Sequence, residues 1–140
     1  MTHKELVNKE AKWLKNFFHC RVVLTELVAC TNSCETPDVI GWVFNKALLV
    51  ECKTNLSDFY ADKKKQARHI GFPALGVWRL FLTPPGLLPK DKLSDGWGLY
   101  EVHGRKIIHM DGWKYNNAGK PPFTSCRDSE VAMLVSALSR

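Results

Sequence analysis

Pro37-Asp38-Val39-Ile40-Gly41-Trp42 and, a few residues later, Leu48-Leu49-Val50-Glu51-Cys52-Lys53 are the two stretches that decide the fold of this chain. Both are apolar runs of strand length. Asn45-Lys46 between them is typical of a short hairpin loop. We therefore expect two neighbouring strands, 38–44 and 47–53, that pair through this loop.

The second of these strands carries charge on one face only. Side chains alternate along a strand, so residues 48, 50 and 52 form an apolar face, while the other face ends in Glu51 and Lys53. Because the hairpin is short, Asp38 converges on the same end. Two carboxylates and an amine at one sheet edge are costly unless a divalent cation uses them. The alternative is that the strand emerges into solvent there, where Glu51 and Lys53 would pair weakly.

The remaining sequence predicts helices and strands in alternation. Residues 3–19 have apolar side chains at helical spacing, and Ser57 is a good N-cap for a second helix. The expected elements are helices at 3–19, 57–69 and 128–138, strands at 21–30, 38–44, 47–53, 78–83, 99–102 and 106–110, and a loop at 111–124. This order predicts a single α/β domain over residues 1–140, a mixed central sheet flanked by helices. Its core is expected at about 3–110, with a C-terminal loop and helix at 111–140.

Composition restricts the class of protein further. The 140 residues include 20 Lys and Arg against 14 Asp and Glu, a net charge of +6, which suits a polyanionic partner without requiring one. No apolar run approaches the roughly 18–20 residues of a membrane helix, and no secretory signal is visible, so we expect no membrane partner. The expected location is the cytoplasm, at the nucleoid or in a host cell if the protein is phage-encoded.

The cysteines support the same location. There are five, at positions 20, 30, 34, 52 and 126, an odd number with loose spacing that favours reduced thiols. Cys30 and Cys34, with His19 or Cys20, would begin a zinc site, but no second ligand pair completes it. Buried free cysteine is the favoured interpretation, above all for Cys52.

The residues at the sheet edge suit magnesium chemistry. Mg²⁺ prefers oxygen ligands and is usually bound by one or two carboxylates plus a phosphate oxygen. Asp38 and Glu51 would supply the carboxylates, and the backbone carbonyl of Cys52 a third oxygen. Such an ion polarises a phosphodiester and activates a water molecule. Lys53 would orient that water and offset the charge that builds on the phosphate.

These residues resemble the PD-(D/E)XK nuclease superfamily. Asp38 follows a proline, 12 residues separate it from Glu51, and Lys53 completes the Glu-x-Lys signature. The resemblance covers about residues 3–110, with the helix-strand-strand-strand-helix-strand order of a restriction-endonuclease-like core. It implies hydrolysis of phosphodiester bonds with Mg²⁺ or Mn²⁺, and it assigns the catalytic positions to Asp38, Glu51 and Lys53.

Two later segments are similar to the small MmcB-like DNA-repair branch of that superfamily, namely residues 55–64 and 78–88. In the superfamily an upstream acidic residue often assists the metal. Glu26 on the first strand is the first candidate and Glu10 on the first helix the second. The alternatives are an outward-facing strand residue for Glu26 and a solvated helix charge for Glu10.

The second expected helix carries further candidates. Asp62, spaced to contact Gln66, would orient Lys53 or a water molecule on the metal. A cluster of basic residues in this helix would contact a nucleic-acid backbone without reading its sequence. Its members are Lys63, Lys64, Lys65 and Arg68. They cannot all share one helix face, so some must face solvent.

The sequence thus predicts a metal-dependent deoxyribonuclease in repair, recombination or mobile-element processing, with RNA as substrate and a homodimer both left open. Two alternatives come from other classes: a non-catalytic nucleic-acid-binding module that keeps the fold, and a small protein-interaction adaptor. Trp97, Trp113 and Tyr115 would either stack on bases or pin loops to the core, and pinning is favoured.

Overall fold

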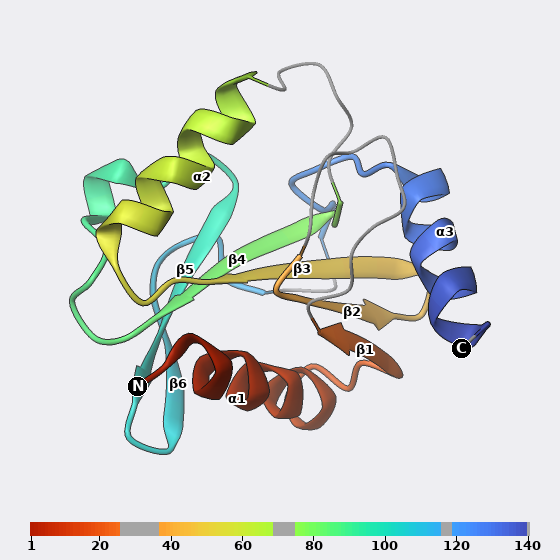
Figure 1. The fold of residues 1–140 in the computed structure, drawn as a ribbon, viewed down its shortest axis with the longest axis horizontal. Coiled ribbons are helices and arrows are strands. Elements are labelled where there is room, and N and C mark those ends of the chain that lie inside the picture. The colour runs from red at the N-terminus through yellow and green to blue at the C-terminus, as the bar shows by residue number, and fades with distance from the viewer. Residues whose placement is uncertain (26–36, 69–74, 116–118, 140) are drawn as a thin grey trace.

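The computed structural model of the chain describes residues 1–25, 37–68, 75–115 and 119–139, without the side chains of 65–68. Its helices and strands follow the expected order (Figure 1). In chain order they are α1 (His3–Asn16), β1 (Val22–Thr25), β2 (Val39–Val43), β3 (Lys46–Cys52), α2 (Leu56–Arg68), β4 (Trp78–Thr83), the short 3-10 helix η1 (Lys90–Lys92), β5 (Trp97–His103), β6 (Lys106–Gly112) and α3 (Arg127–Leu138). None of the helices in these ranges is long and apolar enough to cross a bilayer.

In the described part of the chain, six strands form one mixed sheet in the order β1-β2-β3-β4-β5-β6. β1, β2 and β3 pair antiparallel, β3, β4 and β5 pair parallel, and β6 returns antiparallel to β5. α2 makes the crossover between the parallel strands β3 and β4. The α/β class and the mixed sheet expected from the sequence are confirmed.

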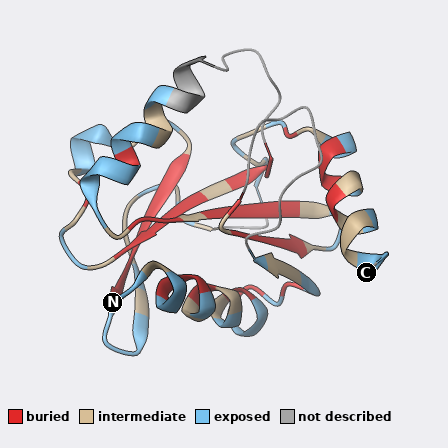
Figure 2. Cartoon of the chain, viewed as in Figure 1, coloured by how far each residue is buried: buried red, intermediate tan, exposed pale blue. Residues whose placement is uncertain are grey.

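Helices cover both faces of the sheet. Leu48, Val50 and Cys52 of β3 pack with the apolar face of α1, as strand alternation predicted. On the other face Leu49 packs against Phe59 of α2, and a third cluster brings Met133 of α3 onto the sheet. In Figure 1 α1 lies below the sheet, α2 at the upper left and α3 at the right. Figure 2 shows β2 to β5 buried almost throughout, which explains their continuous apolar sequences.

Two local expectations are corrected. The β2–β3 hairpin turns on Phe44 and Asn45, one residue earlier than expected, because Lys46 already pairs with Val43. α2 begins at Leu56, and its cap is not Ser57 but Asn55. The Asn55 side chain accepts a hydrogen bond from the Asp58 backbone N–H and donates one to the Asp58 carboxylate. The bond from the Asp58 N–H is an N-cap that satisfies a free N–H of the first turn.

The strands of the last hairpin are longer than expected. Trp97-Gly98 joins β5, and β6 continues through Asp111-Gly112. These glycines resemble loop residues in sequence, but a Cβ on Gly98 would lie 2.2 Å from the Trp113 carbonyl oxygen. Glycine is therefore required by the close approach of two backbones. Trp97 is buried with its ring stacked on Phe81 at 4.4 Å, a core contact.

Candidate active site

Asp38 and Glu51 meet at one edge of the sheet. Asp38 directly precedes β2, and the pairing of Val39 with Val50 places it opposite Glu51 of β3. The two carboxyl groups lie close enough for the charge of Asp38 and a hydrogen bond with it to raise the pKa of Glu51. The structure thus brings together the two carboxylates that the sequence placed at this edge.

Two further groups hold the Asp38 carboxylate. Its Oδ2 accepts a hydrogen bond from the Cys52 backbone N–H at 2.8 Å. Its Oδ1 lies 3.2 Å from Nε2 of His3, in the first turn of α1. Sequence reasoning did not single out His3, and no local pattern could have done so, because the contact depends on how α1 packs against β2. Asp38 is therefore oriented by one backbone and one side-chain group.

Lys53 lies on the same face of the chain as Glu51, one residue beyond the end of β3. Its side chain is only 7% exposed, and Nζ donates a hydrogen bond to Oδ2 of Asp62 on α2. Burial lowers the pKa of Lys53, but the Asp62 hydrogen bond and the charges of Glu51, Asp62 and Asp38 outweigh it, so the pKa is raised above its usual 10.5. Lys53 is thus a fixed ammonium that donates hydrogen bonds and supplies positive charge.

The environment of Glu51 favours its protonated form. Burial raises the pKa of Glu51 well above 4.5, and the charge of Asp38 and the hydrogen bond with it raise the pKa further. Asp62 adds to the effect and Lys53 opposes it. Burial and the neighbouring Asp38 charge therefore favour a proton on Glu51 when no cation is bound. A divalent cation would replace that proton and relieve the repulsion.

Asp38 and Glu51 fit the usual magnesium donor set. Among the described residues, no group of three or more His, Cys, Asp and Glu side chains is arranged to hold a metal ion. Mg²⁺, however, commonly uses only one or two carboxylates, several waters and the phosphates of its substrate. The Cys52 side chain is buried on the α1 face, and the residue follows Glu51 directly, so its backbone carbonyl remains the candidate third oxygen.

Of the two candidates for an assisting carboxylate, only Glu10 lies in the described part of the chain. Glu26 lies outside the described residues. Glu10 is fully buried on α1, on the apolar side of β3, and its charge acts on Cys20, Cys52 and Tyr100. Because Glu51 and Lys53 are on the α2 side of the sheet, Glu10 does not join them. The alternative expectation, that Glu10 is a solvated charge on the helix surface, is also wrong because the side chain is fully buried.

The basic cluster of α2 is only partly described. Nζ of Lys63 donates to the Lys92 backbone carbonyl and lies 5.2 Å above the Phe59 ring, so it ties α2 to η1. Lys64 is exposed. Lys65, Gln66 and Arg68 belong to α2, but their side chains lie outside the described residues.

The described cysteines are free thiols: Cys20 and Cys52 are buried and Cys126 is partly buried. Burial, and after it the charge of Glu10, raises the pKa of Cys20 to about 12. Such a thiol stays protonated and is a poor metal ligand. Cys30 and Cys34 lie outside the described residues.

No protein-family model and no curated protein sequence matches this chain. A solved structure is similar to it, that of a protein of unknown function from Silicibacter pomeroyi. The match covers 100% of this chain and 88% of the other, with 17% sequence identity and a TM-score of 0.63. This similarity shows the fold of the whole chain, an α/β domain with a mixed sheet.

Proposed function

We propose that this protein is a metal-dependent nuclease of the PD-(D/E)XK type that hydrolyses phosphodiester bonds in DNA. The observation that carries the proposal is the contact between Asp38 and Glu51 beside the Lys53–Asp62 ion pair. A module that only binds nucleic acid has no reason to gather carboxylates where a phosphate must approach. The biological setting we favour is repair, recombination or mobile-element processing in the cytoplasm.

The residues around Asp38 and Glu51 would have two roles, metal binding and orientation of the metal ligands. Asp38, Glu51 and the Cys52 carbonyl would hold Mg²⁺ or Mn²⁺. When bound, the ion would supply Lewis acidity to the phosphodiester and make a water molecule more acidic. The Cys52 N–H and His3 keep the Asp38 carboxylate oriented toward Glu51.

Lys53 would act on the phosphate and the attacking water. Its ammonium is held by Asp62 and cannot swing into solvent without breaking a largely buried ion pair. From that position it donates hydrogen bonds to the water and offsets the negative charge that grows on the phosphate. Because it is protonated, Lys53 orients the nucleophile and does not take its proton.

The test is DNA cleavage by variants of these residues. Single-stranded, duplex and branched DNA are incubated with the protein in Mg²⁺, in Mn²⁺ and in EDTA. We expect cleavage only with metal, and Asp38→Ala, Glu51→Gln and Lys53→Ala to lower its rate at least about a hundredfold. Asp91→Ala and Lys90→Ala, on exposed residues of η1, are the matched controls and should cleave normally.

Two outcomes contradict the proposal. Cleavage that survives EDTA or the Asp38→Ala change would mean that another site or a contaminant is responsible. Metal-independent binding without cleavage of any substrate would instead identify a nucleic-acid-binding module that keeps the nuclease fold. Circular dichroism of each variant shows whether loss of cleavage reflects loss of folding.

A further inference from the structure

An open hollow of about 380 Å³ lies at the opposite end of α1 from Asp38. It forms where the C-terminal end of α1 meets the β2–β3 hairpin and the segment after β6. Aromatic and basic residues dominate its lining: Phe17, Phe18, Phe44, Tyr115, His19 and Arg21. Of the described residues that line it, none is acidic.

Two of the aromatic rings at this hollow are exposed, and one of them, Phe17, packs on other rings. Phe44 is 82% exposed and Phe17 63% exposed. Phe17 packs edge-on against the buried Phe18 at 5.1 Å, and Phe18 in turn contacts Tyr115 at 4.3 Å. An exposed ring on a rigid base is the arrangement on which nucleic-acid bases stack.

The presence of a phenylalanine at position 44 is not explained by the stability of the fold. It occupies the first position of the hairpin turn with φ = 54°, a left-handed conformation that glycine or asparagine normally adopts. A bulky residue there costs about 1–3 kcal/mol. Its exposed ring recovers little of that cost through burial. A strained residue that displays an aromatic ring to solvent indicates a use for the ring.

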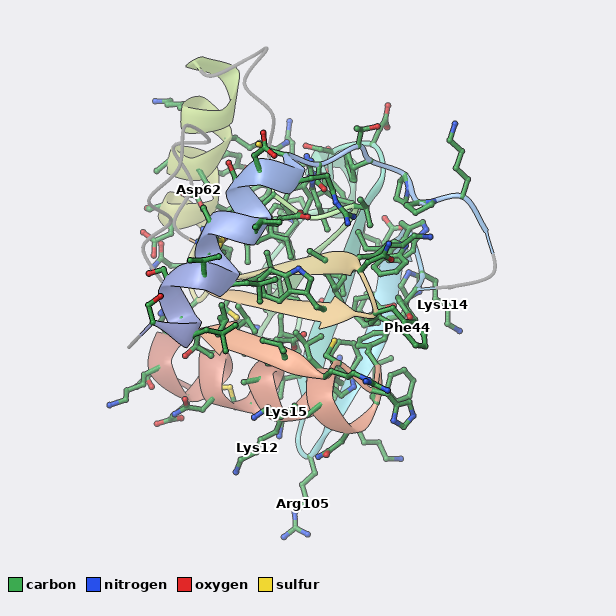
Figure 3. All side chains as sticks on the ribbon, turned by 90° about the vertical axis from the view of Figure 1, so that its right-hand side faces the viewer. Lys12, Lys15, Phe44, Asp62, Arg105 and Lys114 are labelled. Carbon is green, nitrogen blue, oxygen red and sulfur yellow. The ribbon has the colours of Figure 1, made fainter. Side chains whose placement is uncertain are left out.

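Positive charge connects the hollow with the candidate active site. α1 has 14 residues and is about 21 Å long. Its first residue, His3, contacts Asp38, and the chain directly after its last turn lines the hollow. The solvent side of α1 carries exposed lysines at positions 4, 12 and 15 and a single exposed carboxylate, Glu5, so its charge is net positive. Figure 3 shows Lys12 and Lys15 projecting outward from α1, and it shows Phe44 and Lys114 on the side of the view away from Asp62.

We propose that this hollow is a base-stacking subsite for single-stranded nucleic acid. The strand stacks a base on Phe44 and Phe17, and its phosphates follow the lysines of α1 toward Asp38 and Glu51. This deepens the proposed function by naming a single-stranded substrate, and it rests on that function only for where the strand leads. Charge complementarity and the concave, ring-lined shape favour nucleic acid over a flat anionic surface.

Binding is measured without cleavage, by fluorescence anisotropy of a labelled oligo(dT) in EDTA. We expect Phe44→Ala to weaken binding by about 5- to 150-fold, the range for loss of one stacked base. Phe44→Trp should keep the affinity. Lys12→Ala combined with Lys15→Ala should reduce the salt dependence, by about 0.7 in the log–log slope for each lost phosphate contact. Leu138→Ala and Lys90→Ala, on exposed residues of α3 and η1, are the controls.

Phe44→Gly separates function from folding. It relieves the left-handed strain, so thermal stability should be maintained or raised while oligo(dT) binding falls as in Phe44→Ala. A matched DNA duplex should bind more weakly than oligo(dT) to the unmodified protein.

The outcomes distinguish this inference from the nuclease proposal. Equal affinity of Phe44→Ala and the unmodified protein, or no oligo(dT) binding at all, overturns the subsite even if Asp38-dependent cleavage is observed. Phe44-dependent binding without cleavage supports the subsite and contradicts the nuclease. Phe44-dependent binding to anionic vesicles but not to oligo(dT), or Phe44-dependent self-association, would assign the hollow to a membrane or to a second copy, and would also overturn it.

Discussion

Among single residues, Glu10 has the least ordinary surroundings. Its side chain is fully buried, and neither carboxylate oxygen has a hydrogen-bond partner among the described residues. Burial raises its pKa well above 4.5, so the folded protein holds it protonated. Cys20, Cys52 and Tyr100 are the titratable groups on which its charge acts. Ionisation of Glu10 must therefore oppose folding.

The pH dependence of stability tests this account of Glu10. An acid whose pKa is raised in the folded state stabilises the fold fully below its unfolded pKa, and this contribution is lost as pH rises through the folded pKa. Between those two values the unfolding free energy should fall by about 1.4 kcal/mol per pH unit. Because the pKa of Glu51 is raised as well and adds a slope of its own, Glu10→Gln should reduce the total slope without abolishing it. Glu5→Gln, on the exposed side of the same helix, should leave the slope unchanged. Urea unfolding between pH 5 and pH 8 measures both; an identical slope in Glu10→Gln would refute the account.

Asp62 sets the protonation of Lys53. With Asp62 replaced by Asn, burial still lowers the pKa of Lys53 while the largest opposing interaction is gone. If the protein is a nuclease, the alkaline limb of its kcat/KM profile should then move to lower pH, because Lys53 loses its proton earlier. Asp58→Asn, at an exposed position in the same helix, should leave that limb in place. A reduced rate with an unshifted profile would mean that Asp62 acts only on stability.

At the scale of elements, one buried carboxylate attaches α3 to the start of β4. Glu130 is 2% exposed, and its Oε2 accepts a hydrogen bond from the Gly76 backbone N–H at 2.8 Å. Gly76 has φ = 83°, and a Cβ there would lie 2.8 Å from Cβ of Leu49. A glycine is needed at this turn, and its N–H depends on Glu130.

Removal of Glu130 should therefore destabilise the fold. Glu130→Ala leaves the Gly76 N–H buried and unpaired, which costs about 1–3 kcal/mol of unfolding free energy. Asp128→Ala, on the exposed side of the first turn of α3, should change that free energy by less than about 0.5 kcal/mol. Urea denaturation compares the two variants. Equal stabilities would show that water satisfies the Gly76 N–H.

The sequence predicted helices and strands correctly where apolar residues recur at a regular spacing and so form a face that is buried in the structure. The alternation in β3 placed Leu49 and Val50 on opposite faces, and the structure confirms both positions. Positions that depend on one turn residue were not predictable. Phe44 occupies a left-handed turn position that favours glycine, so the sequence placed the turn one residue too late. Asn55 and Ser57 are both good caps in sequence, and only the structure shows that Asn55 accepts the hydrogen bond from the Asp58 backbone N–H.

At the scale of the whole molecule, one part of the candidate site could be predicted from the sequence and another part could not. The meeting of Asp38 with Glu51 could be predicted because a short hairpin fixes which residues lie opposite each other. The approach of His3 to Asp38 could not, because it depends on the packing angle of a helix 35 residues away in sequence. The burial of Glu10 was missed for a related reason. The buried face of α1 includes Glu10 beside its apolar residues, so it is wider than the apolar residues alone indicate.

Metal binding should stabilise the entire fold, because the proposed ligands come from two strands that must pair to bring them together. A ligand that binds only the folded state stabilises it by about 2.7 kcal/mol at 100 times its Kd. Mn²⁺ should therefore raise the thermal midpoint of the unmodified protein in a concentration-dependent manner. The effect should be larger at pH 8 than at pH 5, because the cation competes with the proton that the raised pKa of Glu51 retains. Glu51→Gln should abolish the effect, and Asp91→Asn, on an exposed carboxylate of η1, should retain it. A midpoint that rises equally in Glu51→Gln would place the cation elsewhere on the protein and remove the physical basis for catalysis at this edge.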